Sequence, residues 1–207
     1  MPFFQSFESG LWYNFIVDGF FDDVSKEYKL TEDKDSGKSE IIFPCKSEKN
    51  LCISNFDGDG KPTILPFFKG DADLHLRKRV DHVIFELNQN QKFDVHLIEM
   101  KTTVGSKTWI EVKGKFRASY LTVKAIAAIL DYEIENFCFY TTYEKVSLES
   151  KKENTVTRKA RLGQAAIRPE EEWAGNKFGL NIGDRLSFKH KPIQMTRNSD
   201  GILIQKT

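Results

Sequence analysis

The sequence predicts an α/β protein with a mixed central β-sheet flanked by helices. One observation is a pair of apolar segments, residues 79–87 and 93–100, which are rich in β-branched and aromatic residues and are separated by a polar turn. Such a pair is typical of an antiparallel hairpin. A second observation is an apolar periodicity of helical spacing over residues 115–131, followed by an apolar strand over 134–143. Strands interrupted by a buried helix indicate a sheet on which helices pack.

The N-terminal part is predicted to contribute one helix and two short strands. Residues 26–39 are polar and charged, which favours a loop. Residues 40–46 and 50–56 follow as short strands and are candidates for a hairpin. A helix near residues 5–22 is predicted because its apolar side chains share one face of a helical wheel: Phe4, Phe7, Leu11, Trp12, Phe15 and Ile16.

The C-terminal part differs in composition from the rest of the chain. Residues 151–207 contain 12 Lys and Arg against 6 Asp and Glu, whereas residues 1–100 contain 12 against 18. A turn or short helix is predicted at Pro169, and residues 185–195 and 201–206 are expected to pair across a turn that contains Asp200-Gly201. The chain is therefore divided into an α/β core, residues 1–150, and a basic, β-rich extension, residues 151–207, packed on the same domain.

The overall composition is that of a globular protein. Hydrophobic residues make up 40% of the 207 residues and charged residues 29%. No segment approaches the roughly 18 consecutive apolar residues of a membrane span, and the N-terminus lacks the basic start of a signal peptide. The three cysteines, Cys45, Cys52 and Cys138, form an odd set without a CxxC pair. We therefore expect reduced thiols, no zinc site and a cytoplasmic protein.

The hairpin brings two carboxylates together. Asp81 and Glu99 lie at equal sequence distance from a turn centred on Asn90, so we expect them to face one another across the strands. Two carboxylates in this position can share one hard cation such as Mg²⁺ or Mn²⁺. Lys101 follows Glu99 by two residues and therefore projects from the same face. An ammonium group beside the cation could hold the attacking water and neutralise charge on a phosphate.

At these residues the sequence resembles the PD-(D/E)XK nuclease superfamily, whose signature is an aspartate, a variable gap and (D/E)-x-K in the next strand. Here the signature is Asp81, a gap of seventeen residues, and Glu99-Met100-Lys101. Val80 stands where the namesake motif has proline, which leaves the role of the carboxylate unchanged. The resemblance implies a restriction-endonuclease-like core followed by the C-terminal β-rich extension. It also implies that Asp81, Glu99 and the main-chain carbonyl of Met100 bind Mg²⁺ or Mn²⁺, with Lys101 activating water.

Other residues are candidates for supporting roles. Members of this superfamily often add an acid from the first helix, and Glu8 falls within the apolar face of that predicted helix. Lys115 and Ser119 share a face at the start of the predicted second helix, where they could reach a phosphate or lie in solvent. The basic segment that holds Arg158, Lys159 and Arg161 could grip a nucleic-acid backbone or be a solvated tail. His82 and His96 are expected to point away from the two carboxylates.

The sequence therefore predicts a metal-dependent nuclease that hydrolyses phosphodiester bonds, with DNA as the expected substrate and restriction, repair or defence as its setting. No Gly-rich phosphate loop, Ser-His-Asp arrangement or nucleotide fingerprint indicates another chemistry. An alternative is a catalytically inactive nuclease-fold subunit that binds other molecules. A second alternative is a surface salt bridge among Asp81, Glu99 and Lys101, worth ~0–1 kcal/mol. No membrane partner is expected, and both a homodimer and a place in a larger complex are compatible with the sequence.

Overall fold

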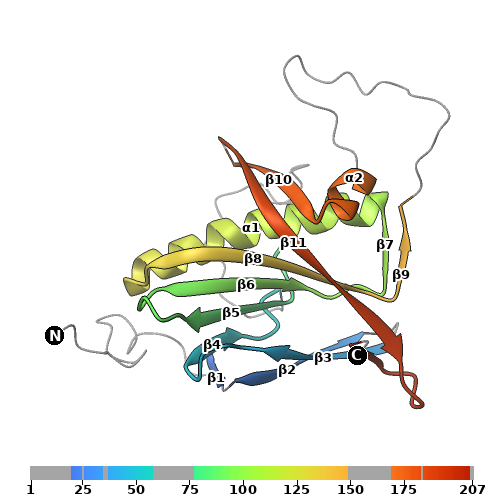
Figure 1. Cartoon of the computed structure of the whole chain (residues 1–207), viewed down its shortest axis with the longest axis horizontal. Helices are drawn as coiled ribbons and strands as arrows, with labels where there is room; N and C mark the ends of the chain where they lie inside the picture. The colour runs from blue at the N-terminus through green and yellow to red at the C-terminus, as the bar shows by residue number, and fades with distance from the viewer. Residues whose placement is uncertain are drawn as a thin grey trace.

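The architecture was obtained as a computed structural model, and it describes residues 20–24, 26–34, 37–57, 77–148, 169–182 and 184–205. A long mixed sheet dominates these residues, with one long helix against it (Figure 1). The middle of the sheet has the order β4-β5-β6-β8-β11. Its strands are β4 (Asn50–Ile53), β5 (His82–Leu87), β6 (Phe93–Glu99), β8 (Ile134–Tyr143) and β11 (Asp184–Arg197).

The pairing directions explain why a helix lies between β6 and β8. The strands β5 and β6 pair antiparallel and are joined by a short turn, whereas β6 and β8 pair parallel. Parallel neighbours need a crossover connection. Helix α1 (Ser106–Leu130) lies in that connection.

Helix α1 covers one face of the sheet. The apolar residues of β5 and β6 on this face, among them Phe85 and Leu97, are fully buried and belong to one core cluster with Trp109, Phe116 and Val123 of α1. These helical residues recur at intervals of seven, which is close to two turns, so they form one stripe along α1. The stripe fixes which side of α1 turns toward the hairpin.

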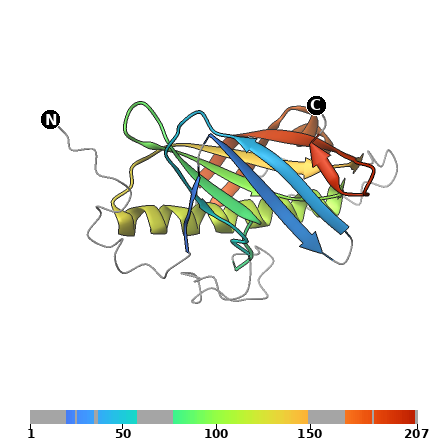
Figure 2. The same ribbon diagram turned by 90° about the horizontal axis from the view of Figure 1, so that it is seen from below.

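The opposite face is covered by strands rather than by a helix in the described part of the chain. The covering strands are β2 (Glu27–Lys34), β3 (Gly37–Pro44) and β12 (Leu203–Gln205). They continue the same sheet, because β11 pairs with both β8 and β12, and β12 pairs with β3. The sheet thus curls over itself (Figures 1 and 2). Leu30, Ile41 and Phe43 pack there in a second core cluster with Ile84 and Ile98 of the hairpin.

Smaller elements complete the fold. They are β1 (Asp22–Val24), paired with β4; β7 (Thr103–Gly105), paired in parallel with β9 (Lys145–Ser147); the short helix α2 (Pro169–Ala174); and β10 (Lys177–Ile182), which pairs antiparallel with β11. In the described residues, no helix has both the length and the apolar content to span a membrane.

Several predictions about the elements are confirmed. The architecture is mixed α/β, and the hairpin, the strand over residues 134–143 and the short helix at Pro169 are present. The C-terminal pairing is present as well, because Met195 lies opposite Gln205 in an antiparallel ladder. The turn between these strands includes Gly201, whose φ of 76° suits a residue without a Cβ.

Other predictions about the elements are wrong. Residues 26–39 were expected to be a loop, but Glu27–Lys34 form β2 and residues 37–39 begin β3. The reason is that the curled sheet offers a buried face to a few apolar residues in an otherwise charged segment. The expected hairpin between residues 40–46 and 50–56 does not form: β3 pairs with β2 and β12, and β4 pairs with β1 and β5. The helix expected near residues 5–22 lies almost wholly outside the described residues, and at its end Asp22 already belongs to β1.

The long helix begins earlier than the periodicity predicted. It starts at Ser106 rather than near Lys115, and residues 103–105 directly before it form β7. Trp109 and Val112 extend the buried stripe toward the N-terminus of the helix. The additional turns place the N-terminal half of α1 beside the end of the hairpin.

Candidate functional site

Asp81 and Glu99 face one another at the open end of the hairpin. His82 pairs with Ile98 in the β5–β6 ladder, and the register extended by one residue puts Asp81 opposite Glu99, as predicted. Both side chains are buried, with exposed fractions of 3% for Asp81 and 0% for Glu99. Because side chains alternate along a strand, both lie on the face that packs against α1.

The backbone around Asp81 is held by hydrogen bonds from three elements. The N–H of Met100 donates to Asp81 Oδ2 at 2.6 Å. The N–H of Phe56 donates to the carbonyl oxygen of Asp81 at 2.7 Å, and the N–H of Val80 donates to Ser119 Oγ of α1 at 2.9 Å. The position of the carboxylate is therefore determined by the hairpin, by the segment after β4 and by the helix together.

Glu99 carries the unusual electrostatics of the site. Its Oε1 accepts hydrogen bonds from Lys101 and forms an ion pair with Lys115 at 2.8 Å. Its Oε2 is buried and has no hydrogen-bond partner among the described residues. Burial and the charge of Asp81 raise the pKa of Glu99 to about 7, although both lysines act in the opposite direction. One oxygen of a buried carboxylate is thus without the compensation that buried charges normally have.

The ammonium group of Lys115 lies among three carboxylates. Its Nζ is 2.8 Å from Glu99 Oε1, 3.3 Å from Asp57 Oδ2 and 3.5 Å from Asp81 Oδ1. Burial alone would lower the pKa of Lys115, but Glu99, Asp81 and Asp57 outweigh it, and the pKa is raised. A positive charge is therefore stabilised at this point of the structure.

Lys101 projects toward Glu99, as its spacing predicts. Its Nζ hydrogen-bonds Glu99 and also the main-chain carbonyl of Met100 at 3.2 Å. Its backbone N–H donates to Thr142 Oγ1 of β8 at 2.9 Å. The side chain retains 23% of its exposed surface, so its charged end lies at the boundary between the buried carboxylates and solvent.

The groups present fit a hard divalent cation. The available ligands are the carboxylates of Asp81 and Glu99, which share a face, and the main-chain carbonyl of Met100, the residue after Glu99, which accepts a hydrogen bond from Lys101. Mg²⁺ is commonly held by one or two carboxylates and keeps several of its waters. The unpartnered Oε2 of Glu99 is an oxygen that such an ion would satisfy. Across the described segments, no three His, Cys, Asp or Glu side chains assemble into a metal-binding group, so two side chains and one carbonyl are the set that this part of the chain offers.

The other candidate residues have different positions. Glu8, Arg158, Lys159 and Arg161 lie outside the described residues. Ser119 is fully buried and accepts the hydrogen bond from Val80, which leaves it no exposed surface for a phosphate.

The sequence did not indicate two contributors to the site. Asp57 was not among the candidate residues, and Lys115 was expected to reach a phosphate or to lie in solvent rather than to contact the carboxylates. A helical wheel that started at Ser106 would have placed Lys115 near the buried stripe, whereas no local pattern marks Asp57.

Comparison of the chain with protein-family models, with curated proteins and with solved structures finds no match. The geometry of Asp81, Glu99, Lys101 and Lys115 is therefore the basis for assigning a function.

Proposed function

We propose that the chain is a divalent-metal-dependent nuclease that hydrolyses phosphodiester bonds of nucleic acid, with DNA as the expected substrate. The observation that carries the proposal is the fully buried Glu99 carboxylate opposite Asp81. Within the described part of the chain, one of its oxygens has no partner and two lysines lie beside the other. Burying two facing carboxylates destabilises the fold, because each buried charge costs several kcal/mol, on the order of the net stability of a domain. We therefore expect the pair to have a function. Binding a cation for a metal-dependent reaction would be such a function.

Each residue of the site has a role in this proposal. Asp81, Glu99 and the carbonyl of Met100 would hold Mg²⁺ or Mn²⁺. The ion, when bound, supplies positive charge to the phosphate and makes a water more acidic. Lys101, at the solvent boundary, would orient the attacking water and contribute charge to the developing phosphorane.

Lys115 would regulate the charge of the site. Its ammonium contacts the same carboxylate oxygens that a divalent cation would need. In the absence of the cation it compensates Asp81 and Glu99 and keeps the fold from carrying uncompensated buried charge. A cation and Lys115 would therefore compete for Glu99 Oε1, and Lys115 would be free to contact the phosphate once the cation is bound.

The fold around the site supports a restriction-endonuclease-like core as part of the proposal. The carboxylates lie at the end of an antiparallel hairpin, and a helical crossover leads to a parallel third strand, which is the arrangement that the sequence resemblance implies. The basic excess of residues 151–207, including Arg158, Lys159 and Arg161, would supply sequence-independent affinity for a phosphate backbone.

A second candidate is an inactive nuclease-fold subunit that binds another molecule. The position of Lys115 favours it, since one ammonium within 3.5 Å of Asp57, Asp81 and Glu99 partly compensates the carboxylates without any metal. In this alternative the charged residues stabilise the fold and take no part in catalysis.

A cleavage assay separates the two candidates. The full chain is incubated with plasmid, linear duplex, single-stranded DNA and RNA, in Mg²⁺, Mn²⁺ or EDTA. We expect cleavage that needs the metal and is lost in Asp81→Asn, Glu99→Gln and Lys101→Met. Asp94→Asn is the matched control, because Asp94 lies on the same hairpin but on its other face, and it should cleave like the wild type. Cleavage that continues in EDTA or in these site variants would contradict a metal nuclease, and no cleavage of any substrate by the folded wild type would favour the inactive subunit.

A further inference from the structure

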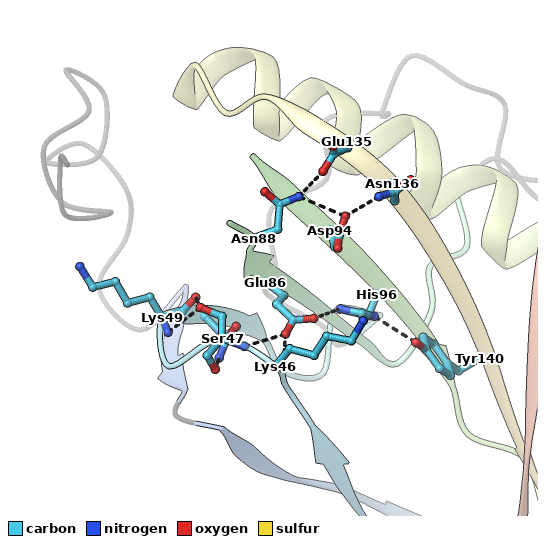
Figure 3. Close-up of polar contacts among 11 residues, drawn as sticks. Lys46, Ser47, Lys49, Glu86, Asn88, Asp94, His96, Glu135, Asn136 and Tyr140 are labelled. Atoms are coloured by element: carbon cyan, nitrogen blue, oxygen red, sulfur yellow. Dashed lines mark hydrogen bonds and ion pairs between the residues drawn. The ribbon is translucent and has the colours of Figure 1, made fainter. Parts of the chain in front are cut away.

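A second polar cluster lies on the other face of the same hairpin (Figure 3). His96 of β6 is held between two side chains: its Nε2 is 2.8 Å from Glu86 Oε2, and its Nδ1 is 3.2 Å from the hydroxyl of Tyr140. Glu86 is fixed in turn by the backbone N–H groups of Lys46 and Ser47, which both hydrogen-bond its Oε1. His96 and Glu86 are buried, with exposed fractions of 7% and 4%.

Cys138 is the cross-strand neighbour of His96. The parallel ladder of β6 and β8 pairs these two residues, so their side chains share one face of the sheet. Cys138 is only partly buried. The next residues toward the strand starts on that face, Asp94 and Asn136, hydrogen-bond each other at 2.7 Å in an exposed position (Figure 3). Along the ladder, the pair of Cys138 and His96 therefore lies between the exposed pair of Asp94 and Asn136 and the more buried part of the sheet.

The order of these groups is that of an activated nucleophile. A thiol, a base beside it and a carboxylate that orients the base are the parts that make a cysteine reactive. Glu86 accepts from Nε2 of His96, and Nδ1 lies 3.2 Å from the Tyr140 hydroxyl. Cys138 is the neighbour of His96 in the β6–β8 ladder.

The electrostatics agree with this geometry. The hydrogen bond with His96 lowers the pKa of Cys138; the charges of His96 and Lys191 act in the same direction and outweigh burial and Asp94. Burial would lower the pKa of His96, but its contacts with Cys138 and Glu86 raise it. Tyr140 stays protonated, because burial raises its pKa. Burial raises the pKa of Cys45 to about 11 and that of Cys52 to about 12, so both other thiols are protonated near neutral pH.

We propose that Cys138 is a nucleophilic site for small soft electrophiles, with His96 as the acceptor of the thiol proton and Glu86 as the residue that positions His96. In the reaction the sulfur of Cys138 forms a bond to the electrophilic carbon and the leaving group departs with its bonding electrons. The thiol proton remains on His96. The site lies on the opposite face of the sheet from Asp81 and Glu99 and does not depend on the nuclease proposal.

The test is the pH dependence of alkylation of the folded, full-length chain by iodoacetamide. The S–C bond forms, the C–I bond breaks and iodide leaves, and the labelled cysteines are followed by peptide mass spectrometry. We expect Cys138 to react at least about tenfold faster than Cys45 and Cys52 at pH 7. We also expect the midpoint of its rate profile to lie below the ordinary thiol pKa of about 8.5. Equal rates for the three thiols, or a midpoint at or above that value, would overturn the proposal. This measurement uses the wild-type chain and does not depend on the folding of a variant.

Variants then assign the roles. His96→Gln, checked for folding by circular dichroism, should move the midpoint of Cys138 alkylation upward by at least about one pH unit, because the imidazolium that stabilises the thiolate is gone. Glu86→Gln should move it less, in the same direction. Cys45→Ser is the matched control and should leave the profile of Cys138 unchanged. An unchanged profile in folded His96→Gln would show that His96 does not activate the thiol.

Discussion

At Glu99, burial and charge act against one another. The carboxylate is fully buried and faces Asp81, and both facts disfavour its ionised form. Lys101 and Lys115 favour the ionised form, yet both contact the same oxygen, Oε1. Both positive charges therefore lie at Oε1, whereas Oε2 has no partner among the described residues and could accept a positively charged ligand.

The role of Lys115 can be tested by Lys115→Met, which keeps the length of the side chain and removes its charge. Without metal, we expect the free energy of unfolding to fall by about 3 kcal/mol, because Asp81 and Glu99 lose a buried counter-charge. Mn²⁺ at about 100 times its dissociation constant should restore about 2.7 kcal/mol. Urea denaturation with and without Mn²⁺ measures both effects.

Lys124→Met is the control for Lys115→Met. Lys124 lies on the same helix, is exposed and contacts the ring of Tyr120, so its loss should change stability little. If Lys115→Met were as stable as Lys124→Met, and indifferent to Mn²⁺, Lys115 would not be the counter-charge of the site.

Glu86 predicts a pH dependence of stability. Burial disfavours its charged form, but hydrogen bonds from His96, Ser47 and Lys46 outweigh burial and hold its pKa below the ordinary value of 4.5. The contribution of Glu86 to the free energy of unfolding is therefore fully present above pH 4.5. It is lost as the pH falls through the lowered pKa that Glu86 has in the folded state. Glu86→Gln should be about 1–3 kcal/mol less stable than the wild type at pH 6, and the difference should shrink below pH 4.5. A difference that stayed constant down to pH 3, measured by urea denaturation, would contradict this.

The residues of the site differ in how far the sequence revealed them. Asp81 and Glu99 could be placed opposite one another because a short hairpin has a register fixed by its turn. Lys101 followed from the alternation of side chains along a strand. Asp57 and Lys115 reach the site from other elements, and their contact with it depends on how these elements pack, which no local pattern records.

At the scale of elements, helix α1 does more than cover the sheet. Ser119 accepts the N–H of Val80 directly before Asp81, and Lys115, one turn earlier on the helix, contacts the carboxylates. The helix therefore positions the backbone at the end of the hairpin through Ser119 and compensates the charge of the two carboxylates through Lys115.

This coupling predicts the effect of Ser119→Ala. The variant leaves the buried N–H of Val80 without its acceptor, which costs about 1–3 kcal/mol. We also expect weaker Mn²⁺ binding, because the backbone directly before Asp81 loses the hydrogen bond to the helix that helps to position it. Ser187→Ala, at an exposed position of β11, should change neither quantity. Thermal unfolding and a Mn²⁺ titration measure them; unaltered Mn²⁺ affinity in Ser119→Ala would show that the hydrogen bond is only structural.

The elements predicted from sequence were those with a strong local pattern. The hairpin of β5 and β6 has two continuous apolar strands and a polar turn, and β8 has a continuous apolar run. Strand β2 was missed because it is mostly charged and buries few residues, such as Leu30. Residues 40–44 of β3 were predicted as a strand, but not its start at Gly37. The first turns of α1 were missed because Gly105 and Ser106 favour a loop locally, although Gly105 serves as the N-cap of the helix.

At the scale of the whole molecule, β11 links the two layers. It pairs with β10 at its start, with β8 over residues 190–194 and with β12 over residues 195–197. The sequence predicted its pairing with β12, which is joined to it by a short turn. Its parallel pairing with β8 joins strands that are distant in the chain, and neither turn residues nor spacing indicate such a contact.

This organisation predicts an order of hydrogen exchange. Strand β6 lies between β5 and β8, and its side chains Val95 and Leu97 are fully buried. The amides of β6 should therefore exchange only through global unfolding. Amides of β9 should exchange far earlier, since all three of its residues are exposed. Hydrogen–deuterium exchange with mass spectrometry measures this order, and early exchange of β6 would contradict a sheet centred on it.

The central claim is that Asp81 and Glu99 hold a divalent cation, and the most direct measurement is Mn²⁺ binding followed by electron paramagnetic resonance. We predict one Mn²⁺ bound per chain in the wild type and in Asp94→Asn, and at least about tenfold weaker binding in Asp81→Asn and in Glu99→Gln. If the folded wild type leaves the Mn²⁺ signal unchanged, or if the two site variants bind as the wild type does, then the buried carboxylates are not a metal site.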